Sequence, residues 1–120
     1  MGKVLAVDDS EPMRKMVGLV LGSAGFEVTL AQNGADALEK LRAEDFDLLV
    51  TDINMPVMHG IDLIQHARRL HEELPILALT TEGQEAMRKR GQDAGANGWV
   101  QKPFKPVQFL EVIRQLVSHT

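Results

Sequence analysis

Short apolar runs alternate with longer amphipathic segments along the whole chain. The apolar runs are rich in β-branched residues and predict five strands, at Lys3–Val7, Phe26–Ala31, Asp47–Thr51, Pro75–Thr80 and Gly98–Gln101. Each run is followed by apolar residues at helical spacing, which predicts helices at 11–24, 34–43, 59–72, 83–94 and 105–118. Because such alternation with right-handed crossovers makes the strands parallel, we expect a doubly wound α/β domain over residues 1–120.

Local signals in the first unit agree with this pattern. The strand Val4-Leu5-Ala6-Val7 has no polar alternation, as expected of a central strand that is covered on both faces. Ser10 is placed to cap the first helix and Gly25 to end it. The apolar stripe of this helix turns Arg14 and Lys15 away from the sheet.

Composition excludes several classes of site and partner. The 120 residues contain no cysteine, which rules out disulfides, thiolate catalysis and cysteine-based metal sites and agrees with a cytoplasmic location. The net charge of −4 argues against binding nucleic acid or an anionic membrane. Four histidines lack the spacing of a metal site and are expected on the surface: His59, His66, His71 and His119.

Chemically active side chains follow the predicted strands. Asp8 and Asp9 follow the first strand, Asp52 the third, Thr80 ends the fourth, and Lys102 follows the fifth. In a parallel sheet these strand ends share one edge, where ligands bind at the crevice in which the strand order reverses. An aspartate after a strand is commonly only a cap or turn residue, so it is the convergence of all five that favours a functional site.

The expected cluster suits a phosphoryl group and a hard cation. Neighbouring carboxylates repel, and a set without histidine or cysteine favours Mg²⁺, with Mn²⁺ as a substitute, over zinc. Mg²⁺ keeps coordination positions for phosphate oxygens, and Lys102 and Thr80 offer the charge and the hydrogen bond that a phosphoryl group requires. Asp52 is the candidate nucleophile, because a carboxylate can attack phosphorus to give an aspartyl phosphate.

Several motifs, in order along the chain, resemble the receiver domain of two-component response regulators. They are Val7-Asp8-Asp9-Ser10, Thr51-Asp52-Ile53-Asn54-Met55-Pro56, Gly60, Leu79-Thr80-Thr81 and Lys102-Pro103-Phe104. The resemblance covers the whole chain and implies a flavodoxin-like (βα)5 sheet with strand order 2-1-3-4-5. It also implies a cis peptide bond between Lys102 and Pro103.

The resemblance implies a role for each site residue. Asp52 would be the phosphoacceptor, Asp9 and Asp52 would bind Mg²⁺ directly, and Asp8 would act largely through water. The backbone carbonyl of Asn54 would be a third protein ligand, while Lys102 and Thr80 would hold the phosphoryl oxygens. Beside them, the side chains of Asn54, Thr81 and Glu82 are expected to tune the lifetime of the phosphoryl group.

The segments around Thr80 and Trp99 look like those of chemotaxis response regulators. We therefore expect one receiver domain over residues 1–120, without an output domain, that signals by phosphorylation-dependent protein binding. Its partners would be a sensor histidine kinase, an output protein such as the flagellar motor switch, and a phosphatase. The fourth helix, fifth strand and fifth helix would form the output surface, with Thr80 and Trp99 as its switch, although the family more often has Tyr or Phe in place of Trp99.

Other interpretations stay open from sequence alone. Within the receiver class, the chain could be a phosphorelay intermediate or a phosphate sink. A rival of another class is a metal-dependent phosphatase with an aspartyl nucleophile, but that superfamily usually carries its Asp-x-Asp pair at the first strand. We expect no enzyme with a separate substrate, but a signalling protein that catalyses its own phosphorylation and dephosphorylation.

Overall fold

The fold is a five-stranded parallel sheet between two layers of helices. The computed structural model describes residues 2–53, 55, 57–81 and 85–118. The strands are β1 (Lys3–Val7), β2 (Glu27–Ala31), β3 (Leu48–Asp52), β4 (Ile76–Thr81) and β5 (Gly98–Lys102). The helices are α1 (Glu11–Ser23), α2 (Gly34–Ala43), α3 (Gly60–Leu70), α4 (Glu85–Ala94) and α5 (Pro106–Ser118). The strand order is β2-β1-β3-β4-β5 and every pairing is parallel, which confirms the predicted class and order.

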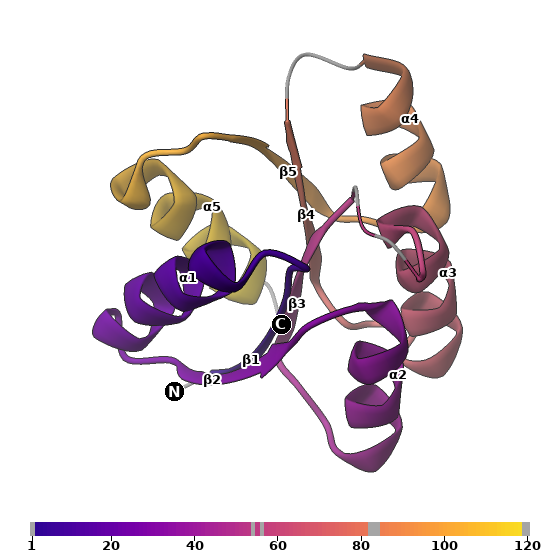
Figure 1. The fold of residues 1–120 in the computed structure, drawn as a ribbon, viewed down its shortest axis with the longest axis horizontal. Helices are drawn as coiled ribbons and strands as arrows, with labels where there is room; N and C mark the ends of the chain where they lie inside the picture. The colour runs from indigo at the N-terminus through magenta and orange to yellow at the C-terminus, as the bar shows by residue number, and fades with distance from the viewer. Residues whose placement is uncertain (1, 54, 56, 82–84, 119–120) are drawn as a thin grey trace.

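Alternate residues of each central strand face opposite helix layers. Figure 1 shows α1 and α5 on one face of the sheet and α2, α3 and α4 on the other. In β1, Val4 and Ala6 pack in a cluster with Val17 of α1 and Phe109 of α5. Leu5 and Val7 of the same strand belong to the other cluster, with residues of α2 and α3. This double burial explains why β1 has no polar alternation.

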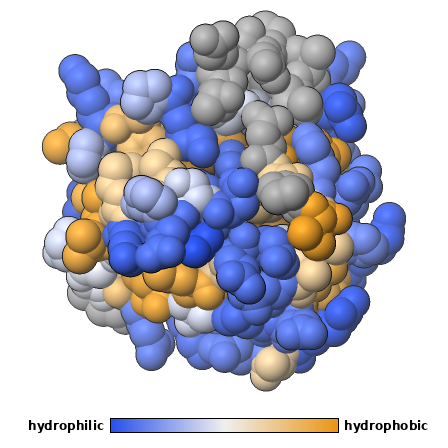
Figure 2. All heavy atoms as spheres, viewed as in Figure 1, coloured by the Kyte–Doolittle hydropathy of each residue, from blue (hydrophilic) through white to orange (hydrophobic). Residues whose placement is uncertain are grey.

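The outer surface of the domain is mixed. Hydrophilic side chains cover most of the face in Figure 2, and apolar patches lie between them. Among the described residues, no helix is both long enough and apolar enough to span a bilayer.

Helix ends follow local capping chemistry. The Ser10 side chain accepts a hydrogen bond from the Met13 amide at 3.5 Å, and Gly25 takes a φ of 96°, a left-handed conformation that favours glycine. Both predicted ends of α1 are thus confirmed to within a residue.

The three histidines that the structure describes, His59, His66 and His71, are half-buried, which corrects the expectation that all four lie on the surface. Two of them make polar contacts at the ends of α3. His59 is half-buried and caps α3, its Nδ1 accepting a hydrogen bond from the Ile61 amide at 3.2 Å. His71 is also half-buried, and its Nε2 lies 2.9 Å from the Leu41 carbonyl oxygen. These caps make α3 shorter than the predicted 59–72. His119 lies outside the described residues.

Arg68 anchors the loop that leads into β5. Its guanidinium donates to the Gly95 carbonyl at 2.6 Å and to Asn97 Oδ1 at 2.8 Å. Asn97 Oδ1 also accepts from the Ile76 amide at 2.9 Å, which ties this loop to the start of β4. Burial lowers the pKa of Arg68, but a guanidinium stays charged at any physiological pH.

Candidate functional site

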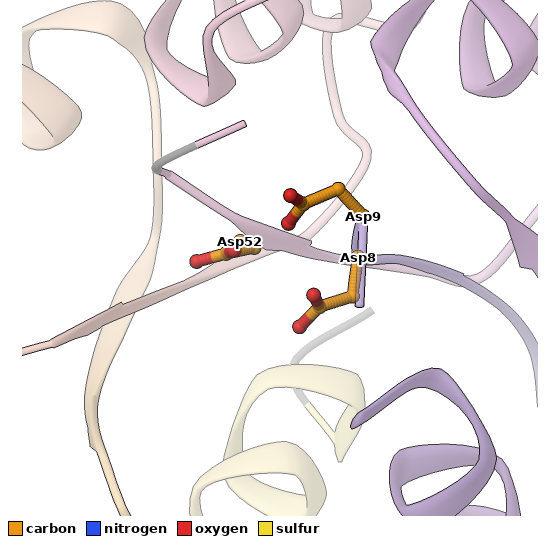
Figure 3. Close-up of side chains that lie close together, drawn as sticks. All are labelled: Asp8, Asp9 and Asp52. Carbon is orange, nitrogen blue, oxygen red and sulfur yellow. The ribbon is translucent and has the colours of Figure 1, made fainter. Parts of the chain in front are cut away.

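Three carboxylates meet at the carboxyl edge of the sheet. β1 and β3 are neighbours, with Val7 paired to Thr51, so Asp8 and Asp9 lie beside Asp52, the last residue of β3. One carboxylate oxygen from each aspartate lies within 4.8 Å of the other two. Figure 3 shows Asp8 and Asp9 extending from the end of β1 beside Asp52. Asp8 and Asp52 are 3% and 4% exposed, whereas Asp9 faces solvent.

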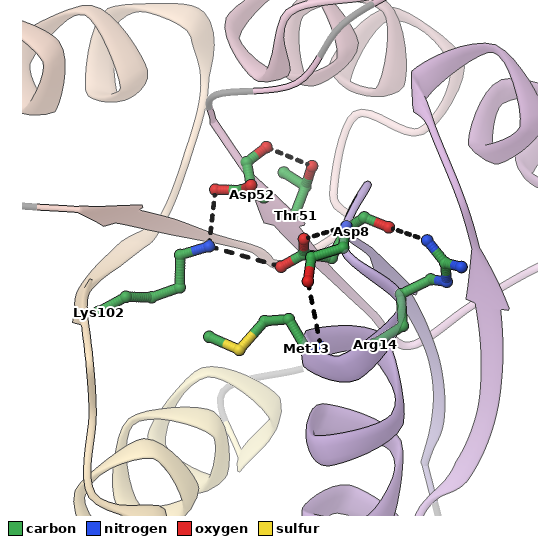
Figure 4. Close-up of polar contacts among 7 residues, drawn as sticks. Asp8, Met13, Arg14, Thr51, Asp52 and Lys102 are labelled. Atoms are coloured by element: carbon green, nitrogen blue, oxygen red, sulfur yellow. Dashed lines mark hydrogen bonds and ion pairs between the residues drawn. The ribbon is translucent and has the colours of Figure 1, made fainter.

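Lys102 joins this cluster from the far side of β4. Its Nζ lies 3.2 Å from Asp52 Oδ1 and donates to Asp8 Oδ2 at 3.5 Å (Figure 4). The lysine side chain is only 12% exposed, so water screens these contacts weakly. The structure thus brings together four of the five residues that the sequence placed at this edge.

The carboxyl group of Asp52 has few favourable partners for its buried charge. Lys102 approaches Oδ1 as an ion-pair partner but not in hydrogen-bonding geometry, and among the described residues this buried oxygen accepts no hydrogen bond. Burial raises the pKa of Asp52; Lys102 opposes the rise, and the charges of Asp8 and Asp9 add to it. A buried acceptor without a partner is costly, which favours a ligand that brings positive charge.

The residues present fit a magnesium ion. The donor set consists of oxygens alone, and the buried Oδ1 of Asp52 still has acceptor capacity. Asp9 and Asp52 would hold the ion directly, with Asp8 nearby. Asn54, whose carbonyl the resemblance adds to the ligand set, lies outside the described residues.

A network around Asp8 fixes the loop between β1 and α1. Ser10 donates its amide to Asp8 Oδ1 at 2.9 Å, and Arg14 donates from Nη1 to the Asp8 carbonyl at 2.7 Å (Figure 4). Arg14 is half-buried, so the expectation that it turns away from the sheet is wrong. The sequence did contain a signal for this contact. Arg14 lies one turn after the Ser10 cap, and from there a long side chain can reach back to the end of β1.

Thr80 and Thr81 lie on β4, between β3, which carries Asp52, and β5, which carries Lys102. Thr80 is 1% exposed and shares a face of the sheet with Ala78, while Thr81 pairs with Lys102 in register. The neighbouring Thr51 donates from Oγ1 to the Asp52 carbonyl at 2.9 Å, a contact that the sequence did not indicate. Glu82 lies outside the described residues.

Trp99 lies on β5, which is an edge strand as expected. It is paired with Ala78 of β4, and its indole packs against the cluster beneath α2, α3 and α4. A groove of about 400 Å³ runs along β5 to α5, lined by Trp99, Lys102, Phe104, Gln108, Val112 and the residues between them on the strand. The Lys102–Pro103 bond is cis, as the resemblance implied.

The structure shows a flavodoxin-like α/β domain with an acidic cluster, Asp8, Asp9 and Asp52, at the carboxyl edge of its sheet. The sequence matches the response regulator receiver domain family over residues 4–114, and the chain belongs to this family. This assignment favours the receiver interpretation over the aspartyl-nucleophile phosphatase.

Relatives and a solved structure narrow the class. The chain is 43% identical over 120 residues to the chemotaxis protein CheY1 of Helicobacter pylori, covering 97% of both chains. It is 36% identical over 118 residues to the response regulator MprA of Mycobacterium leprae, covering 98% of this chain and 52% of that protein. The structure of the Vibrio cholerae chemotaxis protein CheY4 superposes with a TM-score of 0.92 at 42% identity, covering 97% of this chain and 98% of the other. The protein is therefore a receiver-domain response regulator that is similar to chemotaxis proteins of the CheY type.

Proposed function

We propose that Asp52 accepts a phosphoryl group from a phosphohistidine of a sensor kinase. An Asp52 oxygen attacks phosphorus, the bond between phosphorus and the imidazole nitrogen breaks, and the electron pair stays on that nitrogen, which takes up a proton. The observation that carries the proposal is the buried Oδ1 of Asp52, which lacks a hydrogen-bond donor among the described residues and lies 3.2 Å from Lys102.

The surrounding residues have separate roles in this reaction. Asp9 and Asp52 would hold a Mg²⁺ ion directly and Asp8 would act through water, and the positive charge of the ion would offset the charge of the transferred group. Lys102 and Thr80 hold its peripheral oxygens. Asn54, Thr81 and Glu82 would tune the lifetime of the aspartyl phosphate.

The product acts as a signal in the cytoplasm. We infer that a single receiver domain over residues 1–120 binds its output protein through α4, β5 and α5 when phosphorylated. Similarity over 97% of the Helicobacter chemotaxis protein supports a role in chemotaxis, with the flagellar motor switch as output partner and a phosphatase as a further partner. Val107, on α5, is 69% exposed and offers apolar area on this surface.

Labelling with a small donor tests the acceptor. Incubation with acetyl phosphate and Mg²⁺ should give one base-labile phosphate per chain, and D52N should abolish it. Asp45→Asn is a matched control, because Asp45 is exposed and remote from the carboxyl edge of the sheet. Label that persists in D52N would show that another residue is the acceptor.

A second experiment separates an output regulator from a relay or a sink. Phosphorylated and unphosphorylated protein would each be tested for binding to a purified motor-switch protein and for transfer of the label to a histidine phosphotransfer domain. Phosphorylation-dependent binding supports the output role. Transfer without such binding supports the relay, and neither supports the sink.

A further inference from the structure

Gly91 lies inside α4, directly under the indole of Trp99. A Cβ placed on Gly91 would lie 2.5 Å from Cζ3 and 3.2 Å from Cε3 of Trp99. Real Cβ atoms do not approach a carbon as closely as 2.5 Å, and Cζ3 belongs to a rigid bicyclic ring that cannot yield by bending. Any side chain at position 91 must therefore displace either the indole or the helix.

The half-buried indole also packs against the hydrophobic core. Trp99 pairs with Ala78 of β4, which is fully buried, and its ring packs against the cluster that contains Ala78 and Ala94. At the contact with α4, the absent side chain of Gly91 leaves the space that the indole ring occupies. Glycine is a poor helix former, so Gly91 costs α4 intrinsic stability, and its contact with the indole gives a packing role that can offset this cost.

We propose that Gly91 is a positioning residue: by having no side chain, it admits the Trp99 indole against α4 and so sets the shape of the groove beside β5. Trp99 also lines that groove, so displacing its indole from α4 would change one wall of the groove. A role of this groove in binding a partner rests on the proposed function. The packing of Trp99 against Gly91 does not depend on it.

A double-mutant cycle tests the packing relationship. Gly91→Ala should lower the melting temperature when Trp99 is present, because the methyl group collides with the ring. In a Trp99→Leu background the same change should raise it by roughly 3 °C, since alanine is the better helix former. Gly22→Ala in α1 is the control, because no described atom outside the adjoining stretch of α1 lies within 4 Å of its Cβ position, and it should stabilise both backgrounds equally.

The indole itself reports its displacement, since Trp99 is the only tryptophan of the chain. Gly91→Ala should shift Trp99 emission and increase its quenching by acrylamide relative to the unchanged protein. If Gly91→Ala changes the melting temperature in the same direction in both backgrounds, or leaves acrylamide quenching unchanged, the proposal is overturned. If Gly91→Ala alone does not fold, folding of the double variant supports the proposal and its failure to fold contradicts it. The cycle uses unphosphorylated protein without a partner, so its outcome is independent of labelling at Asp52.

Discussion

The Lys102 ammonium, at the end of β5, lies 3.2 Å from Asp52 Oδ1, at the end of β3, although β4 separates the two strands. Both side chains are almost buried, and the carboxylates of Asp8 and Asp9 lie close by. Among these four side chains, the one positive charge of Lys102 faces three negative charges, and this imbalance affects how the site responds to protons, metal and substitution.

Replacing Lys102 should raise the pKa of Asp52 further. Burial raises this pKa already, and Lys102 is the main influence that lowers it. We expect Lys102→Met to shift the Asp52 carboxyl titration to higher pH in metal-free protein, followed by ¹³C NMR of labelled aspartates. Lys105→Met, at an exposed position, should leave the titration unchanged. If the Asp52 titration does not move in Lys102→Met, the charge of Lys102 does not influence the pKa of Asp52.

Asp52→Asn should stabilise the metal-free protein at neutral pH. A group whose folded-state pKa is raised adds stability that is complete below the unfolded pKa, near 3.8, and is lost as the pH rises through the folded pKa. The variant should therefore gain about 1–3 kcal/mol in free energy of unfolding at pH 7, the cost of an unpartnered buried acceptor, and less near pH 4. Urea unfolding at both pH values measures this, and an equal or larger gain at the lower pH would contradict the burial argument.

Magnesium should raise the melting temperature by binding the folded state. The gain in free energy follows RT ln(1 + [Mg²⁺]/Kd), about 2.7 kcal/mol at one hundred times Kd. Asp9→Asn should weaken this response without unfolding the chain, because Asp9 is exposed. Glu11→Gln removes a charge from the nearby start of α1 and should keep the response. Melting curves that coincide in chelator and in millimolar Mg²⁺ would rule out the metal site.

Arg14 should support the metal site through the Asp8 backbone. Its 2.7 Å hydrogen bond fixes the loop that carries Asp8 and Asp9, so Arg14→Gln should cost about 1–2 kcal/mol of stability and lower Mg²⁺ affinity several-fold. Lys15→Gln is the matched control, since Lys15 is exposed and its pair with Glu11 lies in solvent. Unchanged Mg²⁺ affinity in Arg14→Gln would limit its role to stabilising α1.

Strand patterns predicted the sheet and its edge residues because burial on both faces leaves a direct signature in sequence. Leu48, Leu49 and Val50 are all nearly inaccessible, and such an uninterrupted apolar run can only be a central strand here. The end of β3 differs from the prediction: pairing continues to Asp52, which stands opposite Leu79 of β4, one residue beyond the predicted strand. Whether an aspartate ends a strand or follows it depends on backbone pairing that periodicity does not encode.

Contacts between helices and strands were harder to predict from the sequence. The bond from Arg14 to the Asp8 carbonyl ends on a backbone atom, which carries no residue-specific signal. Likewise, Gly91 and Trp99 become complementary only when α4 lies against β5, and a lone glycine in a helical pattern could equally be a weak point of the helix. The polar roles of His59 and His71 depend in the same way on where α3 begins and ends.

A phosphoryl mimic at Asp52 should change the surroundings of Trp99. Trp99 pairs with Ala78, and Thr80 follows two residues later on the same face of β4, so movement of Thr80 toward the phosphoryl group opens space beside the indole. We expect beryllofluoride with Mg²⁺ to shift Trp99 emission and to strengthen binding to a purified flagellar motor-switch protein. D52N should show neither effect. Unchanged emission together with equal affinity in both states would remove Trp99 and the surface of α4, β5 and α5 from the mechanism.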